Sequence, residues 1–296
     1  MNYHHLRVPD DVALVLRATP VHERGVTGRG VLVAMPDTGF YRHPFYPWHG
    51  YNYNATLSPD AIDVDTDDFG HGTAEAANIF AVARDIDFVG VKMGGNATLA
   101  FKTASDLEPA VMTNSWGYDL GGLTTLPNSL LPLEAAVLEA VNQRGIVVCF
   151  SAGNGRHVPD VCGLVGMQPG GIYIELPVQP SCFIDVALSG PGFPNSDETA
   201  PDDGWAVISG TSAASPQAAG VCALLKQAQP GLSPRLVKNI LRASAREVTV
   251  GMSNNGQPAG PGHDAATGAG LMDAFAAYRL GRSVAIRNIF SLPSPR

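Results

Sequence analysis

Three side chains in this chain have the types and the order needed for nucleophilic catalysis: Asp37, His71 and Ser212. A serine hydroxyl becomes a nucleophile when a neighbouring imidazole removes its proton. A carboxylate beside that imidazole selects its tautomer and stabilises the imidazolium that forms. The order aspartate, histidine, serine is one of three unrelated chain orders in which such a triad occurs. These residues therefore indicate acyl transfer through a covalent serine intermediate.

Each of the three residues alone also has an ordinary structural explanation. Asp37 follows an apolar run and could be a turn residue, and His71 could simply begin a helix. Ser212 could be a helix N-cap, which is a common role of serine. Asp-Thr-Gly (37–39) also occurs in aspartic proteases, but they need two such loops in each active site. Position 214 is alanine, so the Gly-x-Ser-x-Gly elbow of an α/β-hydrolase is disfavoured.

Five short motifs give the chain a resemblance to the subtilase family of subtilisin-like serine proteases. Three of them resemble the family's aspartate, histidine and serine motifs: PDTGFYRHP (36–44), GHGTAEAA (70–77) and GTSAASPQAAG (210–220). SAGNG (151–155) is similar to the strand end that carries the family's oxyanion asparagine. TNSWG (113–117) is similar to the strand that lines its substrate cleft. The motifs occur in family order and span about residues 30–275, so chance is a poor explanation for them.

The resemblance implies a serine endopeptidase that hydrolyses peptide bonds through an acyl-enzyme on Ser212. The triad would be Asp37, His71 and Ser212, and the oxyanion would be held by the Asn154 amide and the Ser212 backbone N–H. If His71 must be neutral to act as the base, kcat/KM rises with a pKa of about 6–7. An extended peptide would pair with the cleft strand, and the residues implied for substrate binding are Ser115, Trp116, Gly117, Ala152 and Gly153.

The resemblance implies no cofactor for the chemistry and no metal in the catalytic site, although many subtilases bind structural calcium. The acidic stretch at residues 60–68 is the candidate calcium site. It matches no defined loop such as an EF-hand, so a solvated acidic loop is the alternative interpretation.

The chain also departs from the family pattern. Ala74, Ala213 and Gln217 replace the usual His, Met and His beside the catalytic motifs, and residues 155–209 have no match to the family's Val-Ile-Xaa-Val-Gly-Ala strand. This divergent segment leaves two other functions open. One is a subtilase-like binding or scaffold protein with weak catalysis, and the other is acyl transfer to an amine by a peptide ligase or cyclase.

The elements that must position these residues read as alternating buried strands and helices. Continuous apolar runs predict parallel strands covered on both faces, at 30–36, 86–93, 111–117 and 145–153. Apolar residues at helical spacing predict helices at 73–83, 131–145, 212–229, 233–245 and 271–281. Two further strands are predicted at 172–178 and 182–190. The order predicts an α/β fold in three layers, with a doubly wound, mostly parallel sheet and helices on both faces, as in subtilisin.

Composition limits the partners of the chain. Its 296 residues carry a formal net charge of −8 and no basic stripe, so we expect a polypeptide substrate and no nucleic acid. No apolar run approaches the ~18 residues that span a bilayer, so no membrane association is expected. We expect a monomer with a single peptidase domain over 1–296, its core at about 19–281 and its ends as extensions.

The number and spacing of the cysteines bear on whether the protein is cytoplasmic or secreted. The four cysteines lie at positions 149, 162, 182 and 222 without a CxxC pair, so they do not indicate a zinc site. Cys149 and Cys222 sit in apolar runs and read as buried thiols, while a Cys162–Cys182 disulfide stays open. The localisation is therefore left open between a cytoplasmic protein and a secreted one whose leader has been removed.

Overall fold

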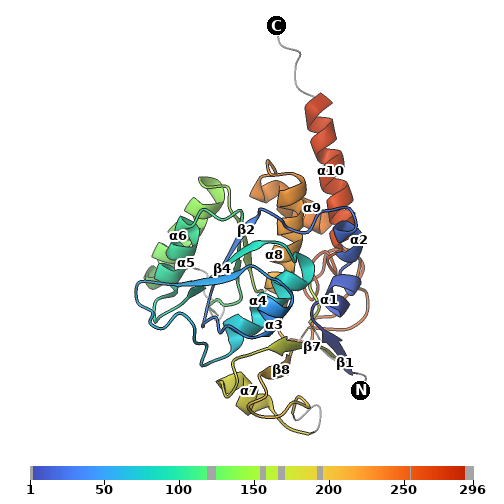
Figure 1. Cartoon of the computed structure of the whole chain (residues 1–296). Coiled ribbons are helices and arrows are strands. Elements are labelled where there is room, and N and C mark those ends of the chain that lie inside the picture. Colours follow the sequence, from blue (N-terminus) through green and yellow to red (C-terminus); the bar gives the residue numbers. More distant parts are fainter. Residues whose placement is uncertain are drawn as a thin grey trace.

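Five parallel strands form the central sheet of the computed structural model (Figure 1). The structure describes residues 3–118, 125–153, 158–165, 171–191, 196–253 and 255–290. The strands lie in the order β3 (Tyr53–Leu57), β4 (Asp87–Lys92), β2 (Leu32–Asp37), β5 (Val111–Asn114) and β6 (Val147–Phe150). All four ladders are parallel, so the carboxyl ends of these strands share one edge of the sheet.

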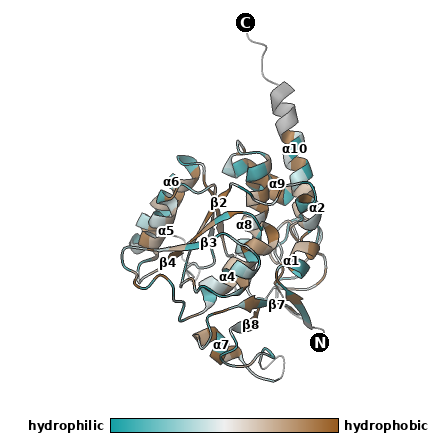
Figure 2. Cartoon of the chain, in the orientation of Figure 1, coloured by the Kyte–Doolittle hydropathy of each residue, from teal (hydrophilic) through white to brown (hydrophobic). Residues whose placement is uncertain are grey.

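Helices cover both faces of this sheet. α5 (Ala97–Asp106) and α6 (Leu131–Asn142) pack on one face, and α4 (His71–Val82) and α8 (Thr211–Ala228) pack on the other. Successive residues of β2 point to opposite faces, so Val33 and Met35 join the core under α4 and α8, whereas Ala34 joins the core under α5 and α6. Apolar residues accordingly gather on the strands and on the inner sides of these helices (Figure 2). The predicted three-layer α/β fold is confirmed.

A second, three-stranded sheet lies below the first in Figure 1 and includes the N-terminal segment. β1 (Tyr3–Arg7) pairs in parallel with β7 (Gly171–Pro177), and β8 (Trp205–Ile208) pairs antiparallel with β7. α1 (Asp10–Val15) follows β1 and buries Val12 in the main core. The first 18 residues are predicted to be an extension, but their described part is built into the fold by strand pairing and apolar burial.

The strand predicted at 182–190 is wrong, because this segment forms helix α7 (Phe183–Leu188). Cys182 is its N-cap and its Sγ accepts from the Asp185 backbone N–H. The buried Asp185 carboxylate accepts from the backbone N–H groups of Ser181 (2.6 Å) and Asp202 (2.8 Å). These local hydrogen bonds outweigh the β-branched composition, and the strand that pairs with β7 is β8 instead.

The remaining elements frame the core. They are α2 (Thr19–His22), α3 (Phe45–Trp48), a 3₁₀ turn (Asn128–Leu130), α9 (Pro234–Ser244) and α10 (Ala274–Phe290). Ser233 caps α9 as expected, since its hydroxyl accepts from the Leu236 N–H at 3.3 Å. All four cysteines are free thiols, so no Cys162–Cys182 disulfide is present. Within the described residues, no helix combines the length and the apolar character that crossing a membrane requires.

Candidate active site

Asp37 and His71 meet at the carboxyl edge of the central sheet. Asp37 is the last residue of β2, the middle strand, and His71 is the first residue of α4. The His71 Nδ1 lies 2.7 Å from the Asp37 Oδ1, and the Thr38 backbone N–H donates to the same oxygen at 2.8 Å. The Asp37 side chain is 1% exposed. A buried carboxylate in this position fixes the orientation of the imidazole and holds the proton on Nδ1.

Two glycines allow the start of α4 to come this close to β2. A Cβ on Gly72 would overlap the Gly39 carbonyl oxygen and lie 3.0 Å from the Asp37 Cβ. Gly70, the N-cap of α4, has φ +94°, a left-handed conformation that favours glycine, and a Cβ there would overlap the Cys182 sulfur. The glycines on both sides of His71 are therefore required by the close approach.

Asp67 supports the same helix start and is a residue that the motif analysis misses. Its Oδ1 accepts from the Thr38 hydroxyl (2.8 Å) and the Gly70 N–H (3.0 Å). Its Oδ2 accepts from the Thr73 N–H (2.8 Å) and the Thr73 hydroxyl (2.7 Å). A carboxylate is well placed here, because the first N–H groups of a helix lack partners within it. The signal in the sequence is an acidic residue shortly before a helix that begins Gly-His-Gly-Thr.

The rest of the acidic stretch at 60–68 does not fit a calcium site. Asp60 accepts from the Ser58 hydroxyl and, at 2.8 Å, from the Asn96 N–H, and Asp65 pairs with Arg42 at 2.7 Å. Asp67 is buried in the cap described above, so the solvated-loop interpretation fails for that residue. No group of three or more His, Cys, Asp or Glu side chains among the described residues is arranged to hold a metal. Asp60, Asp65 and Asp67 thus each have a separate partner.

Ser212 lies in the first turn of α8. The N-cap of that helix is Gly210, so the interpretation of Ser212 as the N-cap is wrong. The Ser212 hydroxyl donates to the Ser115 carbonyl oxygen at 3.1 Å, and no hydrogen bond joins it to His71 within the described part of the chain. Catalytic hydrogen bonds are often absent or long before substrate binds, and a serine hydroxyl changes partner by rotating about one bond.

Pro216 explains the second link between Ser115 and Ser212. Proline has no N–H, so Pro216 within α8 leaves the Ser212 carbonyl without its partner four residues on. The Ser115 hydroxyl donates to that carbonyl at 2.8 Å. Ser115 therefore completes the helix that carries Ser212, and the two serines are tied by reciprocal hydrogen bonds.

The residues assigned to the substrate strand follow the end of β5. The ladder of β5 ends at Asn114, not at residue 117, so residues 115–117 continue beyond the last strand pair. The Trp116 indole N–H donates to the Pro36 carbonyl at 2.9 Å. The Trp116 and Phe150 rings pack edge to face, with their centroids 5.7 Å apart. The indole therefore packs inward. Gly117 is exposed.

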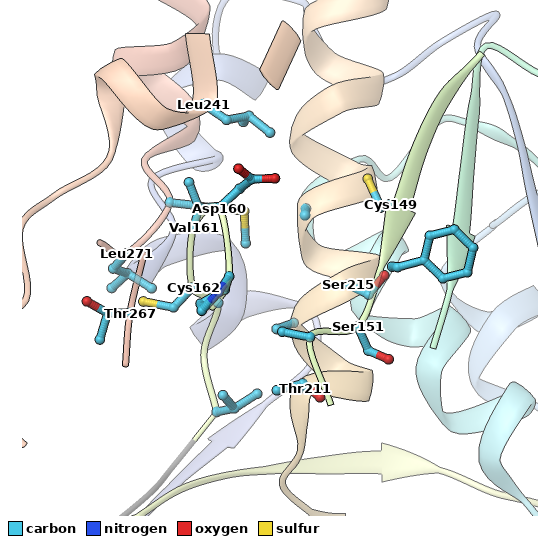
Figure 3. Close-up of a pocket in the computed structure, with 18 of the residues that line it drawn as sticks. Cys149, Ser151, Asp160, Val161, Cys162, Thr211, Ser215, Leu241, Thr267 and Leu271 are labelled. Carbon is cyan, nitrogen blue, oxygen red and sulfur yellow. The ribbon is translucent and has the colours of Figure 1, made fainter. Parts of the chain in front are cut away.

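A cavity of about 910 Å³ lies between β6, α8, α9 and the loops before α10. Ser151, Ala152 and Gly153 line it where β6 ends, and Thr211 lines it where α8 begins. Figure 3 shows Ser151 and Thr211 near one end of the cavity and Leu241 near the other. Most of the lining is apolar. Asn154, the predicted oxyanion residue, lies outside the described residues.

The electrostatics of the site are dominated by carboxylates. Burial lowers the pKa of His71, but the charge and hydrogen bond of Asp37, with the charges of Glu75 and Asp67, raise the pKa to about 9. This pKa is higher than the value of about 6–7 expected for an ordinary imidazole. Glu75, four residues after His71, is a second residue that the motif analysis misses.

Known proteins resemble this chain both in sequence and in fold. The Subtilase family pattern matches residues 28–270. Subtilisin BL of Lederbergia lenta is 28% identical over 282 residues, which cover 89% of this chain and 96% of that protein. The structure of a lanthipeptide protease matches with a TM-score of 0.64 and 20% identity, covering 91% of this chain and 93% of its own. MycP1 with its N-terminal propeptide removed matches with a TM-score of 0.61 and 21% identity, covering 90% and 96%.

Proposed function

This chain belongs to the subtilase family of serine endopeptidases, and from that premise we propose that Asp37, His71 and Ser212 are its catalytic triad. The observation that carries the proposal is the 2.7 Å hydrogen bond between the Asp37 carboxylate and the His71 Nδ1. It leaves the other ring nitrogen, Nε2, to act as the base. Ser212 is the nucleophile, on the first turn of a helix that packs directly against α4.

The reaction follows from these groups. His71 accepts the Ser212 proton as the hydroxyl attacks the scissile carbonyl, and then gives it to the leaving amine. Asp37 stays ionised and stabilises the imidazolium between these steps. His71 then removes a proton from a water molecule, which attacks the acyl-enzyme. His71 returns this proton to the Ser212 oxygen as the acyl group leaves. All proton transfers pass through one nitrogen, so no cofactor takes part.

The oxyanion of the tetrahedral intermediate needs donors that are in place before it forms. The Ser212 backbone N–H lies in the first turn of α8, where N–H groups have no acceptor within the helix. We assign the second donor to the Asn154 side chain from its sequence motif, SAGNG (151–155). Losing one such donor costs about 10²–10³ in kcat.

The substrate binds as an extended strand along residues 115–117, whose backbone continues past the β5 ladder. Because the Trp116 side chain packs inward, this residue contributes its backbone rather than its ring. Ala152 and Gly153 form the wall of the pocket that receives the side chain before the scissile bond. The protein acts as a monomer on polypeptides, without a nucleic acid partner.

The test compares the wild type with Ser212→Ala and with Ser189→Ala, a matched change at the half-buried C-cap serine of α7. We expect the wild type and Ser189→Ala to cleave casein and to be labelled by a fluorophosphonate, and Ser212→Ala to do neither. Equal labelling of all three proteins would remove Ser212 as the nucleophile. The masses of the products distinguish hydrolysis, which adds water, from transfer to an amine.

A further inference from the structure

Glu75 is a buried carboxylate that faces the reactive nitrogen of His71. It lies one helical turn after His71 on α4, and its side chain is only 2% exposed. Its Oε1 is 4.0 Å from the His71 Nε2, the nitrogen that does not bond to Asp37. The imidazole therefore lies between two carboxylates, one at each ring nitrogen.

Hydrogen bonds hold Glu75 in this orientation. Its Oε2 accepts from the Asn78 side-chain amide at 3.0 Å, and the Asn78 Oδ1 accepts from the Gln217 amide at 3.0 Å. The Gln217 Oε1 in turn accepts from the Leu164 N–H at 2.7 Å. This buried chain joins α4 to α8, which carries Ser212. Because Asn78 occupies Oε2, the other oxygen of Glu75 stays directed to His71.

His71 is the only cation paired with Glu75 within the described residues. The residue of α8 in this hydrogen-bond chain is Gln217, which is uncharged. The Tyr46 hydroxyl of α3 donates to the Thr73 carbonyl. On α1 and β7, Asp11 accepts from the Arg7 backbone N–H and Glu175 pairs with the Arg7 side chain, while Asp10 is exposed. On β4, Asp87 is exposed and Lys92 donates to backbone carbonyls of the loop at 63–66. The remaining charges acting on His71 are those of Asp37 and Asp67. An ionised carboxylate buried without a partner is costly, so the charges of Glu75 and His71 are linked.

We propose that Glu75 is a positioning residue that pairs with the imidazolium form of His71 at Nε2 and thereby sets the pH range in which His71 can act as a base. The proposal rests on the proposed triad and adds the regulation of its base. While the pair is intact, the Nε2 proton is directed to Glu75. Once His71 loses that proton, Nε2 can accept from Ser212.

The direction of the pH effect follows from the charges. Burial raises the pKa of Glu75 to about 7, so Glu75 is ionised at higher pH, where it favours the protonated form of His71. Activity should therefore rise with pH through the pKa of His71, near 9. An opposite charge within about 4–6 Å shifts a pKa by about 1–3 units, so removing the Glu75 charge moves the rise to lower pH by that amount.

The experiment measures kcat/KM against pH for the wild type, Glu75→Gln and Glu75→Asp. We expect the rise of kcat/KM with pH to lie about 1 pH unit or more lower in Glu75→Gln than in the wild type. In Glu75→Asp, which keeps a carboxylate, this acid limb of the profile should lie between the two. The control is Glu139→Gln, which removes a charge on the exposed side of α6 and should leave the limb in place. A loss of packing alone lowers activity without moving the limb, so an unmoved limb in Glu75→Gln overturns the proposal.

A second measurement does not depend on hydrolysis. The titration of His71 is followed by NMR in the Ser212→Ala protein, with and without Glu75→Gln. A lower His71 pKa in the double variant supports the pairing even if the wild type proves inactive, in which case only the proposed function fails. An unchanged His71 pKa in a folded double variant overturns the pairing whatever the activity of the wild type.

Discussion

Three buried carboxylates surround the start of α4, and each makes a different contact. Asp37 bonds to the His71 Nδ1, Asp67 receives the first N–H groups of the helix, and Glu75 faces the His71 Nε2. Burial of a charge is costly unless hydrogen bonds or an opposite charge compensate for it. Each acid is therefore held by named donors, and the single imidazole is shared by two of them.

At the residue scale, Asp67→Ala should lower the free energy of unfolding by about 3 kcal/mol or more, because it leaves buried N–H and hydroxyl donors of Gly70 and Thr73 without an acceptor. The measurement is urea unfolding in the Ser212→Ala background, which prevents self-digestion. Asp68→Ala is the matched control, since Asp68 is exposed and its side chain should contribute less than about 0.5 kcal/mol. Equal losses in the two variants would contradict the capping role of Asp67.

At the element scale, the site depends on how two helices begin. α4 starts at His71 beside β2, and α8 starts at Thr211 beside the end of β5. Neither helix has a capping hydrogen bond from its own N-cap side chain, because both N-caps are glycine. In α4, the Asp67 carboxylate accepts from an N–H group of the first turn in place of an N-cap side chain. In α8, the Ser115 hydroxyl donates to the carbonyl that Pro216 leaves without a partner. Residues from neighbouring segments thus support the two helix starts that carry His71 and Ser212.

The link between Ser115 and Pro216 predicts an energetic coupling. Ser115→Ala should lower the free energy of unfolding by about 1–3 kcal/mol, because the partly buried Ser212 carbonyl loses its donor. Pro216→Ala restores an N–H four residues after that carbonyl. It should therefore stabilise the Ser115→Ala protein more than it stabilises the parent. A double-mutant cycle by urea unfolding measures this, and strictly additive effects would refute the coupling.

At the scale of the whole molecule, the central sheet ends at β6, and the large cavity lies beside this edge strand. Its polar wall includes Asp160, whose charge is paired with Lys238 at 2.9 Å. An apolar cavity that begins beside Thr211 suits a large apolar substrate side chain. Under the proposed function, the cavity as a whole, rather than one side chain, would select the residue before the scissile bond.

This cavity predicts the primary specificity. Tetrapeptide anilides that differ only in the residue before the scissile bond should be cleaved about 10–100-fold faster with Phe or Leu than with Glu, because an apolar side chain gains burial and a carboxylate is desolvated. The measurement is kcat/KM for each substrate at one pH. Faster cleavage after Glu or Ala than after Leu would contradict the assignment of the pocket.

Calcium removal gives another test of the whole fold. A calcium ion bound at about 100 times its Kd would stabilise the protein by about 2.7 kcal/mol. Since Asp60, Asp65 and Asp67 are engaged with other partners, we expect the same Tm in excess EDTA and in excess Ca²⁺, measured in the Ser212→Ala protein. A Tm several degrees higher in Ca²⁺ would show that the protein holds a calcium site.

Several features could be predicted from the sequence by itself, because they depend on local patterns. Apolar runs indicated β2, β4, β5 and β6, and helical spacing indicated α4, α6, α8, α9 and α10 but not α5. The motifs around Asp37, His71 and Ser212 indicated the family and proposed the triad. The 182–190 segment was misassigned because its β-branched residues resemble a strand, whereas the hydrogen bonds of Asp185 that favour α7 come from outside the helix.

Only the tertiary structure decided how these residues are held. Asp67 and Glu75 are ordinary acids in the sequence, and their burial beside His71 depends on the packing of α4 against its neighbours. The bond from Ser115 to Ser212 joins residues 97 positions apart, so no local pattern contains it. Long-range packing sets the dielectric surroundings and the partners of a charge, and these in turn set its pKa. The sequence therefore determined which side chains are available, and the fold determined which charges surround His71.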